Sequence, residues 1–415
     1  MKIAVLQDDF PPHHEGGSGV IAHRLAQEYV RKGHEVLVVT TVPTRALSGE
    51  EHMGGMQVAR LFSGHHARSR AYRSLYNPAV VGAVDRLLNN FRPDVVHVHN
   101  VHSDLSYYSI VLARRYTESV YMTAHDAMSF HFGKTLSALE SPADFSEANS
   151  YFESPWRQMK VYRLRYNPFR TMLVRRILNA KVRRILAVSD ALRRALMANG
   201  IMHVEVIHNG IEAGEWGKPR DVDEFKKSHG IGEAAILFGG RLSATKGAYK
   251  ILDALQLVRE KVPGAQLLIL GKKEAYVGPM IEYARDRDIA GALVFTGWIT
   301  GSELRAAYHA ASVVAVPSLY LDPFPTINLE ALACRKPVVA TRYGGSREIV
   351  EDGVSGFIVD PLDAQTMAAK ISELLQDGAK NTAFGQAGYE RVVREFSLET
   401  QTAKYLQLFG SSSSE

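Results

Sequence analysis

The sequence predicts an α/β protein in which two Rossmann-like domains follow one another. Three observations lead to this prediction: the length of 415 residues, an apolar content of 46%, and the alternation of short apolar runs with amphipathic segments along the whole chain. One hydrophobic core rarely organises more than about 300 residues, so two cores are expected. Apolar runs that alternate with helical segments are typical of parallel sheets covered by helices on both faces.

The first half contains a series of strand-like apolar runs. They lie at residues 2–7, 35–41, 95–99, 120–124 and 183–189. A helical pattern extends from Val20 to Lys32, and Gly33 follows at the position where a left-handed residue closes many helices. We therefore predict a parallel sheet with crossover helices in this half.

The second half repeats the pattern. Its strand-like runs lie at 234–240, 265–271, 293–297, 312–318, 337–343 and 356–360. Helices are predicted over 247–261 and over 303–311, where Thr300 and Glu303 have the spacing of a capping box. Apolar periodicity lapses between 209 and 232, and residues 398–409 again have a helical pattern. We predict domains over 1–210 and 211–394, followed by a terminal helix within 395–415.

Composition limits the environment and the partners of the chain. No apolar run approaches the roughly 20 residues needed to cross a bilayer, and the first residues lack a signal-peptide pattern, so we expect a cytoplasmic protein. The net charge of +5 favours anionic partners without choosing among phosphates, nucleic acid and acidic lipids. The single cysteine, Cys334, lies in an apolar stretch and is predicted to be a buried packing residue and not a nucleophile.

A glycine-rich loop joins the first strand to the first helix. Gly16, Gly17 and Gly19 would let a ligand approach the backbone, and the helix N-terminus that follows favours negative charge. The spacing differs from the dinucleotide-binding fingerprint, which disfavours a nicotinamide enzyme. A tight turn is the alternative explanation for these glycines.

Two cations occupy the corresponding place in the second half. Arg241 and Lys246 lie between the strand at 234–240 and the helix at 247–261. Ligands of open parallel sheets bind at this edge, and fixed cations followed by helix amides suit a diphosphate. The alternative is a pair of solvated surface charges.

The stretch from Val316 to Asp360 carries two carboxylates, Asp322 and Glu330, on either side of a Pro-rich turn. The turn leads into a helix that we expect to start at about Thr326. Its first amides, from Ile327 to Leu329 and thus including Asn328, can hold an anion. Glu330 inside the helix can accept hydrogen bonds from the vicinal hydroxyls of a ribose, and Asp322 on the loop can face a sugar.

These residues resemble the retaining glycosyltransferases of family 4, also called group 1, which have the GT-B fold of two facing Rossmann-like domains. The family has two glutamates separated by seven residues, whereas this chain has Asp322 in place of the first. The resemblance covers nearly the whole chain. Its further elements are Pro317-Ser318, Lys336 to Val339, Gly344-Gly345 with Glu348, Thr123 to Asp126, Val188 to Asp190, Asn209 to Ile211, Gly240 to Leu242, and Lys246-Gly247.

The resemblance implies a deep cleft between the domains, a terminal helix that returns to the first domain, and retention of anomeric configuration. It also implies specific residue roles. The donor diphosphate would be bound by Arg241 and Lys246, the ribose by Glu330, the transferred sugar by Asp322 and, from the opposite domain, by His125; Gly17 and Gly19 would line the cleft.

These roles predict a transfer that needs neither a metal nor another cofactor, because Arg241, Lys246 and helix amides can neutralise the departing diphosphate. The donor would be a UDP- or GDP-sugar, and the acceptor a glycan, a lipid-linked molecule or a small molecule of cell-envelope or polysaccharide biosynthesis. A sugar-nucleotide epimerase of the same fold and a non-catalytic nucleotide-sugar-binding protein remain as alternatives.

Two further patterns stay open. His97, His99 and His102 are a metal-site candidate, although a histidine cluster at a strand end is the favoured explanation. The segment from Pro155 to Val188 holds ten Lys or Arg residues and no Asp or Glu. It would contact an anionic membrane or a lipid-phosphate acceptor, or else be a solvated basic face. No nucleic-acid module accompanies it, so a nucleic-acid partner is not expected.

Overall fold

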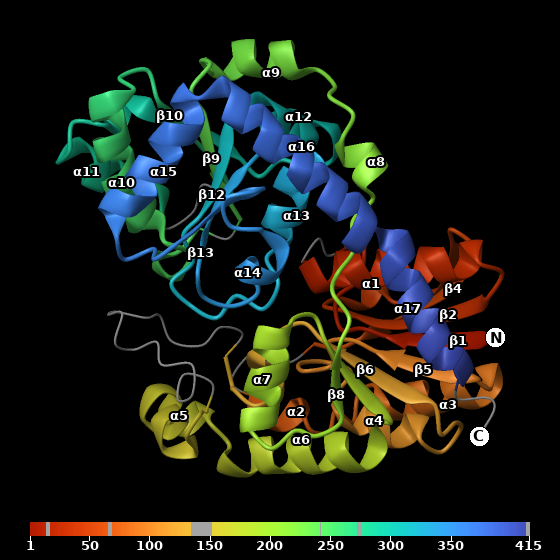
Figure 1. Ribbon diagram of the computed structural model, residues 1–415. Coiled ribbons are helices and arrows are strands. Elements are labelled where there is room, and N and C mark those ends of the chain that lie inside the picture. Colours follow the sequence, from red (N-terminus) through yellow and green to blue (C-terminus); the bar gives the residue numbers. More distant parts are fainter. Residues whose placement is uncertain (14–16, 65–68, 134–151, 241, 272–275, 412–415) are drawn as a thin grey trace. The chain divides into compact units, whose positions relative to one another are not determined.

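The computed structural model describes the chain apart from residues 14–16, 65–68, 134–151, 241, 272–275 and 412–415. The described residues divide into two compact units (Figure 1). Among the described residues, unit 1 contains those from Met1 to Asn209 and those from Leu398 onward, and unit 2 contains those from Gly210 to Ser397. Both units have the α/β architecture that the sequence predicts.

Unit 1 is built on a sheet with the strand order β3-β4-β2-β1-β5-β6-β7-β8. Neighbouring strands in the described residues are parallel, except that β3 runs antiparallel to β4. Figure 1 shows α3, α4 and α6 on the face of the sheet opposite to α1. Its main elements are β1 (Lys2–Leu6), α1 (Gly17–Arg31), β2 (Glu35–Val42), β3 (Gly49–Met53), β4 (Met56–Phe62), α2 (Arg70–Arg73), α3 (Val81–Phe91), β5 (Val95–Val98), α4 (Tyr108–Ala113), β6 (Val120–Ala124), α5 (Pro155–Tyr162), α6 (Pro168–Lys181), β7 (Arg184–Ala187), α7 (Asp190–Ala198), β8 (Val204–Val206) and α17 (Leu398–Gly410).

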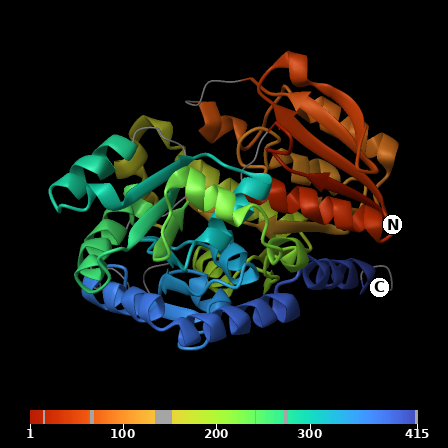
Figure 2. The same ribbon diagram turned by 90° about the horizontal axis from the view of Figure 1, so that it is seen from above.

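The last helix, α17, belongs to the core of unit 1. It packs beside α1 (Figure 2), and its Tyr405 and Phe409 join a buried cluster with Leu25 of α1 and Val5 of β1. The hydroxyls of Tyr405 and Thr123 lie 2.9 Å apart, which ties α17 to β6. Helix α17 is therefore part of unit 1, although the preceding 188 residues, from Gly210 to Ser397, form the other unit.

Unit 2 contains a parallel sheet with the order β11-β10-β9-β12-β13-β14. Figure 1 shows α10, α11 and α15 on one side of this sheet and α12, α13 and α16 on the other. Its main elements are α8 (Ala213–Trp216), α9 (Val222–His229), β9 (Ala235–Gly239), α10 (Ala248–Lys261), β10 (Gln266–Leu270), α11 (Val277–Arg285), β11 (Leu293–Gly297), α12 (Gly301–Ala310), β12 (Val313–Val316), α13 (Thr326–Ala333), β13 (Val338–Thr341), α14 (Ser346–Ile349), β14 (Gly356–Val359), α15 (Ala364–Gln376) and α16 (Gly378–Glu395).

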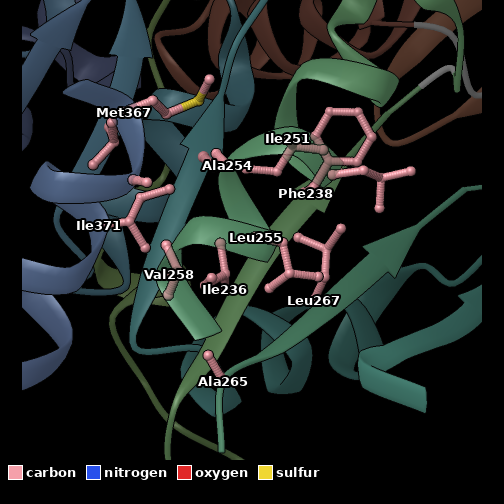
Figure 3. Packing of buried hydrophobic residues seen from close by; sticks show 14 of the residues in the cluster. Ile236, Phe238, Ile251, Ala254, Leu255, Val258, Ala265, Leu267, Met367 and Ile371 are labelled. Carbon is pink, nitrogen blue, oxygen red and sulfur yellow. The ribbon is translucent and has the colours of Figure 1, made fainter. Parts of the chain in front are cut away.

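The core of unit 2 lies between its sheet and the pair α10 and α15. Figure 3 shows Ile251, Leu255 and Val258 of α10 beside Ile236 of β9 and Ile371 of α15. Each of these five side chains is fully buried. Burying a side chain of this size contributes roughly 1.5–3 kcal/mol, so this layer holds β9 and the start of α10 in fixed positions.

The sequence predictions of strands and helices are largely confirmed. The strands at 120–124 and 293–297 match β6 and β11, and Gly33 has the left-handed φ of 82° expected of a helix cap. The predictions were wrong in omitting β3, β4 and β8. The residues of β3 are mostly exposed and polar, so this strand has no apolar pattern. Helix α12 begins after Thr300 as expected, but the Thr300 side chain makes no capping hydrogen bond.

Within the part of the chain that the structure describes, no helix combines the length and the apolar character that spanning a bilayer requires.

Candidate functional site

Strands β9 and β12 are neighbours in the sheet of unit 2. The strand order runs away from this pair in both directions, with β10 and β11 beyond β9 and with β13 and β14 beyond β12. In open parallel sheets, ligands bind beyond the carboxyl ends of the strands at such a point. The loops that follow β9 and β12 are fixed to each other, because the Leu319 amide donates to the Thr245 carbonyl at 2.7 Å. Gly247 has a φ of 83°, and a Cβ there would collide with the carbonyl of Pro317. Both loops therefore hold one defined arrangement.

An ion pair joins the two loops. The Nζ atom of Lys246 lies 2.6 Å from Oδ2 of Asp322, and the Tyr320 hydroxyl donates to the same carboxylate oxygen at 3.1 Å. Burial alone would lower the pKa of Lys246, but the Asp322 carboxylate outweighs burial and raises this pKa well above its usual value. Lys246 is therefore a permanent cation at the ligand-binding edge of the sheet.

A glycine turn supports the backbone of Asp322. The Gly345 amide donates to the Asp322 carbonyl at 2.9 Å. Gly344 has a φ of 73°, and a Cβ at this position would collide with the backbone of Asp322. The Gly344-Gly345 pair of the sequence motif is thus explained by close packing against Asp322.

Of the two predicted diphosphate-binding cations, the structure places Lys246 at this edge. Arg241 lies outside the described residues. Its role therefore stays a prediction from the sequence.

Helix α13 starts at Thr326, as the sequence predicts. Thr326 and Ile327 are half-buried at its N-terminus, whereas the Asn328 and Leu329 side chains are buried. The Asn328 amide donates to the Pro325 carbonyl at 3.1 Å, and its side chain donates to Ser346 at 3.1 Å. The Leu329 side chain therefore packs in the core. Because the Asn328 amide is already bonded, an anion at this helix N-terminus would be bound chiefly by the amides of Thr326 and Ile327.

Glu330 is held by a residue that the sequence analysis did not assign to the site. Its Oε2 atom accepts a hydrogen bond from the Tyr308 hydroxyl of α12 at 2.5 Å. Tyr308 is 2% exposed and packs edge-on against Trp216. Burial, with a further effect of Glu330, raises the pKa of Tyr308 well above its usual value, so the hydroxyl stays protonated and donates.

Tyr308 lies within the helix predicted over 303–311, and the sequence analysis gave it no role in the site. A buried tyrosine hydroxyl requires a polar partner, and that requirement was the available signal in the sequence. The identity of the partner depends on how α12 and α13 pack, which periodicity does not give.

The sheet of unit 1 has the equivalent edge between β1 and β5. The Asn100 amide donates to the Gln7 side chain at 2.8 Å, and the Asn100 side chain donates to Ser18 at 3.0 Å and to Asp126 at 3.2 Å. These bonds join the ends of β1 and β5 to the first turn of α1 and to the loop after β6. Polar groups from four separate segments thus meet at one edge of unit 1.

The glycines of the first loop differ in their surroundings. A Cβ on Gly19 would collide with the carbonyl of Asp9, whereas a Cβ on Gly17 would meet no atom of the described residues within 4 Å. Gly19 is therefore required for packing the start of α1 against the loop after β1. Gly17 has open space beside it in unit 1.

His125 follows β6 at the same edge. Its Nε2 atom lies 2.9 Å from Nδ1 of His99, with the two rings stacked. The pKa of His125 is lowered to about 4, chiefly by burial. The charge of Asp126 raises this pKa in part, and His102 lowers it further. Its Nδ1 atom has no hydrogen-bond partner among the described residues. His125 is thus a neutral imidazole at this edge of the sheet.

The other histidines of the cluster have partners within the protein. His97 is bonded to Thr123 at 2.8 Å and to Tyr29 at 3.1 Å, and His102 lies 3.2 Å from Asp126. The described residues contain no group of His, Cys, Asp or Glu side chains arranged to hold a metal ion. The strand-end cluster, which the sequence analysis favoured, agrees with these contacts.

Cys334 is buried, as predicted, and its thiol donates to the Trp216 carbonyl at 3.2 Å. Burial, together with the nearby Glu330, raises the pKa of the thiol. A protonated, enclosed thiol is a packing residue.

Comparisons with known proteins agree with this architecture. Residues 15–215 match the family described as Glycosyltransferase Family 4, and residues 220–391 match Glycosyl transferases group 1. The sucrose-phosphate synthase of Thermosynechococcus elongatus has the same fold, with a TM-score of 0.77 at 21% identity over 100% of this chain and 99% of the other. The Anabaena HepE protein, solved with UDP and glucose, gives a TM-score of 0.71 at 19% identity over 99% and 100% of the two chains.

Curated relatives are similar in sequence over long stretches. The glycogen synthase of Mycobacterium tuberculosis is 27% identical over 99% of this chain and 94% of its own. A GDP-mannose-dependent mannosyltransferase of Mycolicibacterium smegmatis is 32% identical over 44% of this chain and 50% of its own. The fold and these matches define a GT-B glycosyltransferase. Within that class, the chain belongs to glycosyltransferase family 4.

Proposed function

We propose that the chain transfers a hexose from a UDP- or GDP-sugar to an acceptor of cell-envelope or polysaccharide biosynthesis, with retention of configuration and without a metal ion. The acceptor would be a glycan, a lipid-linked molecule or a small molecule, bound by unit 1, while unit 2 binds the donor. The observation that carries the proposal is the Lys246–Asp322 pair at the reversal point of the unit 2 sheet. The UDP-bound HepE structure and the GDP-mannose-dependent relative support a nucleotide-sugar donor.

Lys246 would bind the diphosphate of the donor, together with Arg241. Breaking the bond between the anomeric carbon and the phosphate leaves negative charge on the diphosphate, and a fixed cation stabilises that charge. The ammonium group has three N–H donors, so a bond to Asp322 leaves donors for phosphate oxygens. The amides of Thr326 and Ile327 would add to this site.

Glu330 and Asp322 would serve different parts of the donor. Glu330, oriented by the Tyr308 hydroxyl, would accept hydrogen bonds from the ribose hydroxyls. Asp322, held by Lys246, Tyr320 and the Gly344-Gly345 turn, would accept from hydroxyls of the transferred sugar. Both carboxylates are fixed by neighbours within unit 2, so each would meet the donor in a defined position.

His125 would contact a sugar hydroxyl as a neutral imidazole, since burial keeps its pKa near 4. Its bond to His99 occupies one ring nitrogen, and the other, a buried atom without a partner among the described residues, would bond to the ligand. Gly17, beside open space, would admit part of the substrates close to the backbone, next to Gly19.

Incubation with a panel of nucleotide sugars and candidate acceptors tests the proposal. We expect a glycosylated product whose anomeric proton in the NMR spectrum shows the configuration of the donor, formed equally in the presence of EDTA. Epimerised donor without a new glycosidic bond would favour an epimerase. Nucleotide binding with no turnover, unchanged in Asp322→Ala and Asp322→Glu, would favour a non-catalytic binding protein.

A further inference from the structure

Helix α6 exposes apolar side chains on one face. Phe169 is 64% exposed, Met172 49% and Leu173 38%. Residues three and four positions apart share one face of a helix, so these side chains lie together, and the exposed Arg176 continues the same face. We call Phe169, Met172, Leu173 and Arg176 the α6 face; Figure 1 shows α6 along the lower edge of unit 1.

The opposite face of α6 is anchored in unit 1. Arg170, Val174 and Leu178 are buried there. The Arg170 guanidinium donates to the Ser74 hydroxyl at 3.0 Å and to the Met128 carbonyl at 2.9 Å. These contacts fix the rotation of the helix about its axis. The α6 face therefore stays exposed in the folded unit.

Exposed cations occur on α6 and in the segment that precedes it. Exposed basic side chains occur along α5, α6 and the turn between them: Arg157, Lys160, Arg163, Arg165, Arg175, Arg176 and Lys181. None of them forms an ion pair with a carboxylate among the residues that the structure describes. Trp156, at the start of α5, is 73% exposed. Among the described residues, the surface thus combines apolar and aromatic side chains with positive charge that no ion pair neutralises.

We propose that the α6 face, with the basic side chains around it, binds the surface of an anionic phospholipid bilayer. The apolar side chains would enter the boundary between head groups and acyl chains, where they leave water. The Arg and Lys side chains would lie at the level of the lipid phosphates, attracted by the negative surface potential. This binding concerns unit 1 and does not depend on the donor site.

The composition of the surface favours a membrane over two other occupants. Nucleic acid would engage the cations, but its phosphates offer nothing to the aliphatic side chains of Met172 and Leu173. A second copy of the chain in a symmetric contact would bring the same positive charges together. An anionic bilayer satisfies both the apolar side chains and the charges.

Vesicle sedimentation of the full chain tests this proposal, with phosphatidylcholine vesicles that contain or lack phosphatidylglycerol. We expect binding to the anionic vesicles, weakened by salt. Arg176→Glu should weaken binding by roughly 30-fold, since it changes two units of charge near the leaflet. The double variant Phe169→Ser with Leu173→Ser should lose binding at any salt concentration. Arg86→Glu and Leu47→Ser, exposed in other elements of unit 1, are matched controls and should bind as the parent does.

Circular dichroism melting of each variant establishes that the fold is retained. Equal partition of all folded variants, or binding that does not distinguish the two vesicle types, would overturn the proposal. The proposal would also be overturned if the α6 variants bound vesicles as the parent does but no longer formed dimers in light scattering. The same holds if they bound vesicles as the parent does but no longer bound single-stranded RNA.

Discussion

The ammonium of Lys246 and the carboxylate of Asp322 lie 2.6 Å apart although 76 residues separate them in the sequence. They come from the loops that follow β9 and β12, the two strands between which the sheet of unit 2 reverses its order. The pair is largely enclosed, with side-chain exposures of 23% for Lys246 and 9% for Asp322. An enclosed charge without its partner is unfavourable, so each residue holds the other in place.

Removing either partner should therefore destabilise unit 2 more than removing both. We expect Lys246→Met and Asp322→Asn each to lower the midpoint of thermal unfolding. The double variant should recover part of the loss, with a coupling of about 1–3 kcal/mol. Calorimetric melting of the four proteins measures this coupling. Strictly additive effects would show that the ion pair does not stabilise the loops.

Tyr308→Phe should impair donor binding with little effect on the overall fold. The change removes the hydroxyl that donates to Glu330, and a hydrogen bond to a charged group contributes about 1.5–3 kcal/mol. The KM for the donor should rise about tenfold or more, with a smaller change in kcat.

Tyr283→Phe is the matched control for Tyr308→Phe. It removes a similar bond, from the Tyr283 hydroxyl to Asp253 at 2.7 Å, between α11 and α10. An equal rise of KM in both variants would contradict the positioning role of Tyr308.

Replacing each of the two glycines of the first loop with alanine should affect a different property of the protein. Gly19→Ala places a methyl group against the Asp9 carbonyl and should destabilise unit 1 by about 1–3 kcal/mol. Gly17→Ala has space for its methyl group and should leave stability unchanged while lowering turnover, if substrates approach the backbone there. Urea unfolding and initial rates measure the two effects. Full activity of Gly17→Ala would remove Gly17 from the site.

How far the sequence predicts this structure depends on the range of the interactions involved. The apolar runs of β9, β12 and β13 predict a parallel sheet because such strands are buried on both faces. The exposed residues of β3, including Glu50 and Glu51, carry no such signal. The pairings of Lys246 with Asp322 and of Tyr308 with Glu330 are set by packing between separate elements. The sequence pattern identified Lys246, Asp322 and Glu330 as candidate site residues, but it did not predict which residues they contact.

Acid should destabilise unit 1 through His97. Burial, with a smaller effect of His125, lowers the pKa of His97 to about 3. The unfolded chain protonates this histidine below about pH 6.5 while the folded chain does not, so stability falls as the pH falls from 6.5 towards 3. The stabilisation is complete above that window.

Replacing His97 isolates this contribution. When the pH is lowered from 7 to 5, the free energy of unfolding should fall by about 2 kcal/mol less in His97→Gln than in the parent. The exposed His52 provides the control, and His52→Gln should follow the parent. Identical pH profiles of the parent and His97→Gln would contradict a neutral, buried His97.

The central claim is that the cationic edge between β9 and β12 binds the diphosphate of the donor, and titration calorimetry with UDP and GDP tests it most directly. Lys246→Met should weaken binding of the preferred nucleotide by roughly 10- to 150-fold, the value of one hydrogen bond to a charged group. Lys250→Met, a half-buried lysine at the start of the neighbouring α10, should bind as the parent does. Unchanged affinity in folded Lys246→Met, or in its combination with Arg241→Ala, would contradict the account.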